Sequence, residues 1–311
     1  MARKYDVAVI LVNYNSSDFT LNCVASIFEK TSSSVQLQVI VIDNNSPKAE
    51  FEKLTPLRSK EHVVLFQGKL NVGFSGANML GVQFADAEFY YFLNNDCLLL
   101  NDCISILKKF MEAEPRAANC SGEMFIANGD YEYNFRYFPS LALKLLGSGL
   151  LRIMNPGAYP SRHKRFQVPT RVDLVNGSSM FIRATAFEEI GGFDTNYFLY
   201  CEEEDIALRF YRKGYGTFII PEARYQHFVS KSTTSNNQIS LPYLKEYYIS
   251  FFYYFRKNYN YFYAGLMRLY FVIKIGVKFY KTLDYLRLAL FIAGGCHMKH
   301  SLRFTQKITN H

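Results

Sequence analysis

The chain has 311 residues, 49% of them hydrophobic, and a formal net charge of +8. This composition excludes a disordered chain, and the length fits one domain of roughly 220 to 250 residues with an appendage. Residues 243–311 contain eleven Lys and Arg against two acids and carry +9, which leaves residues 1–242 at −1. The six cysteines lack the paired spacing of a metal site, so reduced cytosolic thiols are the simplest account.

The first hundred residues alternate between predicted strands and helices. The apolar run 7–12 predicts a strand rather than a signal peptide, and Leu21, Val24 and Ile27 follow at helical spacing. Further strands are expected at 39–42, 63–66 and 91–93. The first, second and fourth strands end in Asn and Asp residues. Since the carboxyl ends of parallel strands meet at one rim, these polar ends should converge there.

The fourth strand runs directly into Asn94, Asn95 and Asp96. Ligands of open α/β sheets bind at this end of the strands, and a carboxylate without a neighbouring Lys or Arg suits a hard divalent cation. An Asx turn that closes the strand is the simpler alternative. Taken alone, residues 94–96 favour the Asx turn. The sequence on either side of them favours the metal site.

A Gly-rich segment follows the third strand. Gly73, Gly76 and Gly81 do not have GxGxxG spacing, which argues against an NAD-dependent enzyme. The small residues either allow a ligand to approach a helix N-terminus or allow close helix packing, and packing best explains Gly81.

The middle of the chain has weaker signals. A helix is expected at 104–111, and the region 120–172 is expected to be an irregular insertion of the kind that is often functional. Its basic run 162–165 is interpreted as a solvated loop. Order returns with a strand at 180–182 and a helix at 184–190.

A second chemical site is expected at the acidic run Glu202 to Asp205. Acids are common in a first helical turn, but four neighbouring acids raise one another's pKa, which suits a general base. A strand at 216–220 then leads to His227, which is either structural or a metal ligand.

Seven blocks resemble, in order and spacing, the inverting family-2 glycosyltransferases with the GT-A fold, and most closely their bacterial rhamnosyltransferase-like branch. The resemblance covers residues 7 to about 235. The blocks are VNYNSS (12–17), VIDNNS (41–46), NVGFSGAN (71–78), FLNNDC (92–97), VNGSSMFIR (175–183), GGFDTNYFLYCEEEDIALR (191–209) and PEARYQHFVS (221–230). This resemblance implies an α/β fold with a mixed, mostly parallel sheet flanked by helices.

The resemblance also implies a nucleotide site at the rim. Asp43 would contact the base, and Asn15 and Asn45 would line the pocket. The same blocks supply further expected nucleotide-binding residues: Asn13, Asn71, Gly73, Asn78 and Asn95.

The metal and catalytic residues follow from the same resemblance. Asp96 matches the last carboxylate of a DxD-type motif and would hold Mg or Mn at the donor diphosphate, with His227 completing the shell. Glu202 and Glu203 occupy the place of a Glu–Asp pair that contains the catalytic base, and we assign the base to Glu202 with Glu203 as the alternative. The chain departs from the family twice: its metal motif has one carboxylate, and its pair is Glu–Glu followed by Glu204.

The tail is expected to be a separate helical unit. We place the catalytic domain at 1–240 and a basic, aromatic tail at 241–311. Tyr248, Phe251 and Phe255 belong to an amphipathic stripe, and Lys274, Lys278 and Lys281 are expected on one helical face. Basic aromatic helices favour the surface of an anionic membrane, whereas a cap on the core or a homodimer contact are the alternatives. No nucleic-acid motif is present, so a nucleic-acid partner is not expected.

The expected function is therefore transfer of a sugar with inversion. A metal would stabilise the leaving nucleoside diphosphate while a carboxylate deprotonates an acceptor hydroxyl. The leading donor is dTDP-rhamnose, then a UDP-hexose, and the acceptor is a cell-surface glycan or one linked to polyprenyl diphosphate. We expect the protein in the cytoplasm, peripherally attached to the inner face of the cell membrane. The alternative is a non-catalytic sugar-nucleotide or glycan-binding member of a membrane assembly complex.

Overall fold

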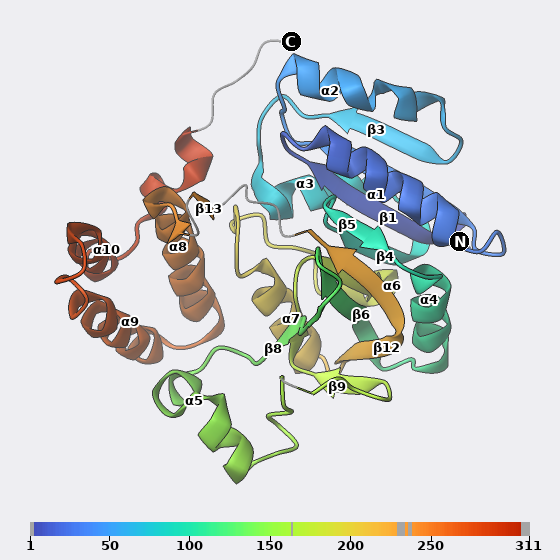
Figure 1. Ribbon diagram of the computed structural model, residues 1–311. Helices are drawn as coiled ribbons and strands as arrows, with labels where there is room; N and C mark the ends of the chain where they lie inside the picture. The colour runs from blue at the N-terminus through green and yellow to red at the C-terminus, as the bar shows by residue number, and fades with distance from the viewer. Residues whose placement is uncertain (1–2, 163, 229–233, 236–237, 306–311) are drawn as a thin grey trace.

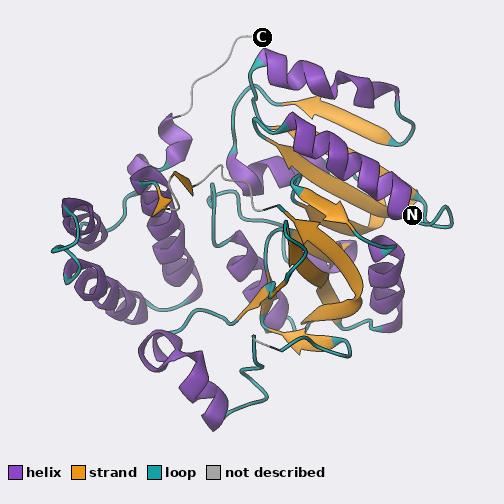
Figure 2. Cartoon of the chain, in the orientation of Figure 1, coloured by secondary structure: helices purple, strands orange, loops and turns teal. Residues whose placement is uncertain are grey.

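A computed structural model of the chain describes residues 3–162, 164–228, 234–235 and 238–305. A ten-stranded mixed sheet forms its centre, with helices on both faces, and the helices α8 to α10 follow at the C-terminal end (Figures 1 and 2). This arrangement confirms the expected α/β class, the mostly parallel sheet and the C-terminal helices.

The N-terminal half alternates parallel strands with helices. Strands β3, β2, β1 and β4 lie side by side in that order, and the register pairs Asn13 with Asp43 at the ends of β1 and β2. The four expected strands are confirmed to within a few residues. The bounds are β1 Tyr5–Asn13, α1 Ser17–Lys30, β2 Leu37–Asp43, α2 Lys48–Leu54, the 3-10 helix η1 Thr55–Ser59, β3 Val63–Gln67, α3 Gly73–Val82 and β4 Ala87–Leu93.

The second half extends the sheet with mixed pairing. Antiparallel β11 lies between β4 and β6, parallel β12 follows β6, and β5 closes the edge. The bounds are β5 Cys97–Leu99, α4 Cys103–Ala113, β6 Ala117–Ile126, β7 Tyr131–Glu132, β8 Phe135–Arg136, α5 Leu141–Met154, β9 Thr170–Val172, β10 Leu174–Val175, β11 Ser179–Arg183, α6 Ala184–Glu189, α7 Glu202–Arg212 and β12 Gly216–His227.

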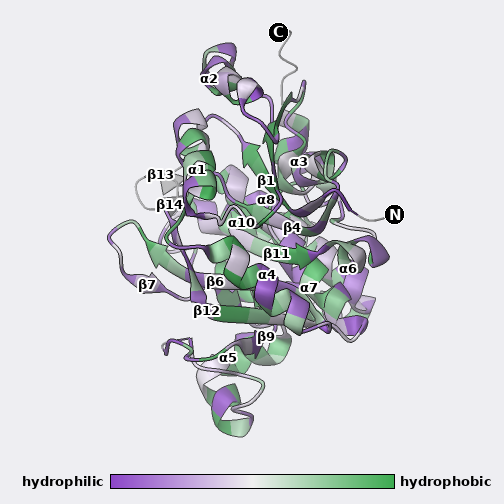
Figure 3. Cartoon of the chain, turned by 90° about the vertical axis from the view of Figure 1, so that its right-hand side faces the viewer, coloured by the Kyte–Doolittle hydropathy of each residue, from purple (hydrophilic) through white to green (hydrophobic). Residues whose placement is uncertain are grey.

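The central strands β1, β2 and β4 are buried on both faces, which explains why they are predominantly apolar (Figure 3). Alternate residues of a strand point to opposite faces. Val7 and Val9 join the core cluster that also contains residues of α1 and α4, whereas Ala8 and Ile10 join the cluster with α3 and α6.

The tail packs against the catalytic half. Tyr248, Phe251 and Phe255 are buried in a third cluster together with Tyr197 and Cys201, which precede α7. Part of the aromatic stripe therefore caps the core, while the domain boundary itself stays a prediction. The tail elements are β13 Thr234–Ser235, β14 Gln238–Ile239, α8 Leu241–Asn258, α9 Tyr261–Gly276, α10 Leu283–Ala293, η3 Met298–His300 and η4 Leu302–Thr305. Among the described residues, no helix combines the length and the apolar character that crossing a bilayer requires.

The interpretation of residues 120–172 as irregular is wrong. Strand β6 lies inside the sheet, and α5 is a helix of 14 residues. Buried polar residues interrupt the apolar pattern of β6; Ser121, for example, donates to the Ser179 hydroxyl at 3.1 Å. Helix α5 escaped detection because Gly147, with φ 73°, breaks its helical backbone.

The basic run 162–165 is also not simply solvated. Arg165 forms an ion pair with Glu123, which is 2% exposed, and Arg162 stacks over the Tyr137 ring at 5.4 Å. His163 lies outside the described residues. The run therefore fastens its loop to β6 and to the segment after β8.

Two smaller expectations are corrected as well. Strand β12 continues past Pro221 to His227, because a register shift between Ile220 and Arg224 accommodates the proline. Lys278 and Lys281 follow the end of α9 in turn residues, so they do not share a helical face with Lys274.

Candidate active site

Hydrogen bonds at the sheet rim tie the ends of β1 and β2 together. The Asn13 amide donates to Asp43 Oδ1 at 2.7 Å, and the backbone N–H of Ser46 donates to Asp43 Oδ2 at 3.0 Å. Both Asn13 and Asp43 are 0% exposed. Asp43 therefore shapes the turn beneath the rim, and direct contact with a base stays a prediction.

The loop after β1 carries the exposed part of this rim. Asn15 has φ 55°, is exposed, and its backbone N–H donates to the Ser46 hydroxyl at 2.9 Å. Asn45, with φ 70°, lies in the facing turn. The Asn95 amide donates to Ser16 Oγ at 2.7 Å and to Thr20 Oγ1 at 2.8 Å. The structure thus brings together the expected residues of β1, β2 and β4.

The Gly-rich segment joins the rim through Asn44. Its amide donates to Asn71 Oδ1 at 2.9 Å, and its Oδ1 accepts from the Val72 N–H at 2.9 Å. Gly73 has φ 78°, and a Cβ there would lie 2.2 Å from the Phe198 carbonyl oxygen. The buried Asn78 amide donates to the Phe74 carbonyl. Gly73 and Asn78 thus have clear packing roles, whereas Asn71 is partly exposed.

Close packing also explains Gly81, as expected from the sequence. A Cβ there would lie 2.5 Å from Ile10 Cγ2 in β1. Helix α3 can therefore lie directly on the sheet, which places its N-terminus at the rim.

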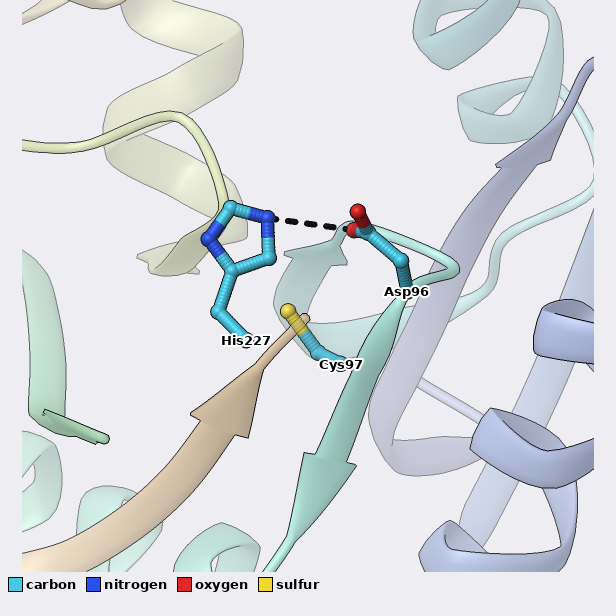
Figure 4. Close-up of side chains that lie close together, drawn as sticks. All are labelled: Asp96, Cys97 and His227. Atoms are coloured by element: carbon cyan, nitrogen blue, oxygen red, sulfur yellow. Dashed lines mark ion pairs between the residues drawn. The ribbon is translucent and has the colours of Figure 1, made fainter. Parts of the chain in front are cut away.

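Asp96, Cys97 and His227 form a group of ligand atoms within 4.8 Å of one another (Figure 4). The antiparallel register pairs Cys97 of β5 with His227 at the end of β12, and His227 Nε2 lies 3.1 Å from Asp96 Oδ1. Burial, followed by the neighbouring Asp96, raises the pKa of the Cys97 thiol well above its usual value, and a soft thiol is a poor ligand for Mg or Mn. The remaining oxygen and imidazole donors fit Mg or Mn, with diphosphate oxygens as further ligands.

The acidic run occupies the first turn of α7, and Arg136 of β8 lies across it. The Arg136 guanidinium contacts Glu203 Oε1 at 2.5 Å and Glu204 Oε1 at 2.7 Å. Cys201 at the N-cap has φ 66°, which turns the chain sharply into the helix. Glu202 Oε2 has no hydrogen-bond partner within the described ranges.

Burial dominates the electrostatics of this cluster. It raises the pKa of Glu202 well above its usual value, and the charge of Glu203 adds to the effect. Burial also raises the pKa of Glu204, to about 7, although Arg136 partly opposes the shift. The expected elevation of the pKa is therefore present in Glu202 and Glu204, with burial as its main cause, and Glu202 holds a proton near neutral pH.

A short turn before β11 connects the two groups. The Ser178 carbonyl accepts from the Asn94 N–H at 2.9 Å, beside Asp96. A Cβ on Gly177 would lie 3.8 Å from the Glu203 carboxyl carbon and 3.9 Å from Glu202 Oε1. The Asp96–His227 pair and the acidic turn thus flank the same three residues, 176–178.

The sequence matches the family described as Glycosyl transferase family 2 over residues 8–191. This span is more than half of the chain. The chain belongs to glycosyl transferase family 2. The expected family is therefore confirmed, while Glu202, Glu203 and His227 lie beyond the matched span and rest on geometry.

Solved structures support the GT-A fold of this family 2 glycosyltransferase. A crystal structure of GalNAc-T7 with UDP, GalNAc and Mn2+ superposes with a TM-score of 0.59 at 16% identity, covering 79% of this chain and 47% of the other. A structure of S. aureus TarS 1-349 gives 0.55 at 14% identity, covering 82% and 66%. At these identities the likeness concerns the fold.

Curated relatives include named rhamnosyltransferases. Rhamnosyltransferase WbbL of Escherichia coli is 28% identical over 176 residues, 52% of this chain and 63% of its own length. An N-acetylglucosaminyl-diphospho-decaprenol L-rhamnosyltransferase of Mycobacterium tuberculosis is 34% identical over 80 residues, 25% and 26% of the two chains. The matches thus span less than two thirds of these relatives.

Three residues of the glycosyltransferase site were not assigned from sequence. Arg136 stood in the supposed irregular region, yet a lone Arg between Phe135 and Phe138 is a signal for a buried acidic partner. Asn44 and Cys97 lie inside recognised blocks, but their contacts depend on Asn71 and His227, which are distant in sequence.

Proposed function

We propose that the chain transfers a sugar from a nucleoside diphosphate donor to an acceptor hydroxyl, with inversion at the anomeric carbon. The observation that carries this proposal is the juxtaposition of two unlike groups across the turn 176–178. On one side lies the metal-ligating pair Asp96 and His227, and on the other the acidic turn held by Arg136.

A divalent cation held by Asp96 and His227 would neutralise charge that develops on the departing diphosphate. The single carboxylate is sufficient because donor phosphates complete the shell of Mg or Mn. The exposed Asn15 and the partly exposed Asn71 would face the nucleotide, together with Asn45. Asn13, Asp43 and Asn95 support the loops from below.

We assign the base to Glu203 in preference to Glu202. Only an ionised carboxylate can accept the acceptor's proton, and Glu203 pairs with the Arg136 guanidinium. Glu203 is half-buried, whereas Glu202 is buried and retains its proton. Glu202 then supports its neighbour, and the reaction needs no covalent intermediate.

Similarity to the rhamnosyltransferases supports dTDP-rhamnose as donor, with a UDP-hexose as second choice. The name of the mycobacterial relative supports a saccharide on a polyprenyl diphosphate as acceptor. Such an acceptor requires contact with a membrane, so we place the protein at the cytoplasmic face as a peripheral protein.

Thermal unfolding with nucleotides tests the donor site. UDP or dTDP at a hundred times its Kd, with Mn, should raise the Tm of the wild type by roughly 5 °C, because ligand binding stabilises the folded state. Asp96→Ala should abolish the metal-dependent part of the shift. The control Asp86→Ala removes an exposed carboxylate at the opposite end of β4 and should retain it.

Thermal unfolding, combined with a measurement of sugar release from the donor, separates sugar transfer from non-catalytic binding of the nucleotide. If saturating nucleotide stabilises neither form, the donor site is refuted. If nucleotide binds but sugar is never released from any donor, the non-catalytic binding protein becomes the better description.

A further inference from the structure

Helices α5, α9 and α10 expose large apolar side chains along one side of the molecule. In α5, Leu145, Leu150 and Ile153 are 62%, 46% and 81% exposed. In α9 and α10, Ile273 and Leu290 are 57% and 63% exposed. We call these exposed residues of the three helices the apolar face.

The parts of the apolar face are in contact with one another. The Tyr263 hydroxyl of α9 accepts from the Leu141 N–H of α5 at 2.7 Å, and the Tyr270 hydroxyl donates to the Lys144 carbonyl at 2.9 Å. Helix α10 packs on α9. Figure 1 shows the three helices along the side of the molecule opposite α2 and β3. The first turn of α5 is therefore joined to the tail helices, although α5 and the tail are far apart in sequence, and Leu150 and Ile153 follow in the part of α5 beyond Gly147.

Positive charge accompanies the apolar side chains. Residues 261–293 contain five basic residues and only Asp284, whereas in α5 Lys144 lies over the Phe251 and Phe271 rings and Arg152 is half-buried. Lys274 and Lys281 are exposed beside the apolar side chains, and Arg287 pairs with Asp284 at 3.1 Å. Exposed apolar residues with surrounding Lys and Arg match the chemistry of an anionic lipid surface.

Both α5 and the tail are connected to the acidic turn. Arg136, which holds Glu203, precedes α5 by only five residues, and the buried Phe251 of the tail packs in the cluster that contains Cys201 before α7. A saccharide attached to a membrane lipid would thus meet the acidic turn from this side.

We propose that the apolar face is a docking surface for an anionic membrane, formed jointly by α5 of the catalytic half and by α9 and α10 of the tail. The proposal rests on the proposed function only for its lipid-linked acceptor. The docking itself follows from exposure and charge, and it goes beyond a tail anchor because α5 inserts as well.

Vesicle co-sedimentation of the full chain tests the proposal. We expect at least tenfold stronger binding to phosphatidylcholine vesicles with 30% phosphatidylglycerol than to phosphatidylcholine alone. Lys274→Gln/Lys278→Gln/Lys281→Gln should weaken binding to the anionic vesicles at least tenfold, since each basic residue contributes about fivefold. The control Lys48→Gln/Lys60→Gln/Lys109→Gln removes the same charge far from the face and should lose less than threefold.

A separate variant tests the contribution of α5 to vesicle binding. Leu145→Ser/Leu150→Ser/Ile153→Ser should weaken vesicle binding at least tenfold, because it removes the apolar side chains that enter the interface. The control Phe84→Ser/Leu100→Ser changes exposed apolar residues elsewhere and should bind normally. Equal binding of the α5 variant and wild type would overturn the proposal.

Two further readouts separate the remaining outcomes. A dimer by light scattering that the α5 variant converts to monomer, without vesicle binding, would assign the face to a second copy and overturn membrane docking. The nucleotide-dependent Tm shift should be unchanged in the α5 variant. If the wild type binds the vesicles but shows no nucleotide-dependent Tm shift, the donor site is refuted and membrane docking is not.

Discussion

Replacement of Arg136 by Met should make stability strongly dependent on pH. The guanidinium is the counter-charge of Glu203 and Glu204, whose side chains are 14% and 9% exposed. Removal of one partner of a buried ion pair costs about 3 to 5 kcal/mol when the other charge stays buried. The acids escape this cost if they take up protons.

The direction in which stability changes with pH depends on which state, folded or unfolded, binds more protons. Glu204 has a folded-state pKa of about 7, above its usual value of 4.5, so the folded state binds more protons and its stability falls as pH rises between these values. In the wild type this penalty reaches about 3 kcal/mol above pH 7. Without Arg136 the pKa rises further, and the variant loses an additional ~1.4 kcal/mol per pH unit for each extra proton.

Urea denaturation at pH 5.5 and pH 8.0 measures the difference. Because Glu204 is already protonated below about pH 7 in the wild type, its extra proton counts only above that pH, and the destabilisation caused by Arg136→Met should be about 1.4 kcal/mol larger at pH 8.0 than at pH 5.5. In a Glu204→Gln background the difference should shrink, because one of the buried acids is then neutral. Equal destabilisation at both pH values, in both backgrounds, would refute the role of Arg136 as counter-charge.

Two further predictions concern catalysis and the rim. Glu203→Gln should lower kcat about 10²- to 10⁴-fold with little change in KM, whereas Glu202→Gln should cost less than tenfold; steady-state kinetics with the reverse ranking would restore Glu202 as the base. Gly73→Ala should cost at least 2 kcal/mol in urea denaturation, because φ is positive and the Cβ would meet a backbone oxygen. Gly149→Ala, at a helical position with open space, should instead stabilise by about 0.5 to 1 kcal/mol, and similar effects of both changes would contradict this account.

The strands of the N-terminal half were predictable because both faces of the sheet are covered. Continuous apolar runs such as 7–12 and 39–42 leave strand as the best interpretation, and polar residues mark their ends. Strand β6 was missed because Asn119, Ser121 and Glu123 are buried polar residues. Glu123, for example, is paired with Arg165, which lies 42 residues away in the sequence. Such partners exist only after folding.

The site was predictable in outline for a similar reason. Asp96 follows a recognisable strand, and its family block places it at the rim, but the choice between Glu202 and Glu203 depends on Arg136. The resemblance places both Glu202 and Glu203 in the family's Glu–Asp pair, and the assignment to Glu202 had no further support in the sequence. The counter-charge that distinguishes the two acids comes from a short strand that no periodicity reveals.

The turn 176–178 fixes the separation between the metal ligands and the acidic turn. Because Ser178 is bonded to the loop of Asp96 and Gly177 packs on Glu203, three consecutive residues span the gap between the metal ligands and the acids. The length of this span depends on covalent peptide geometry rather than on side-chain rotamers. Substitutions of side chains on the surrounding loops would therefore change the shape of the pocket while leaving the spacing between the metal ligands and the acids unaltered.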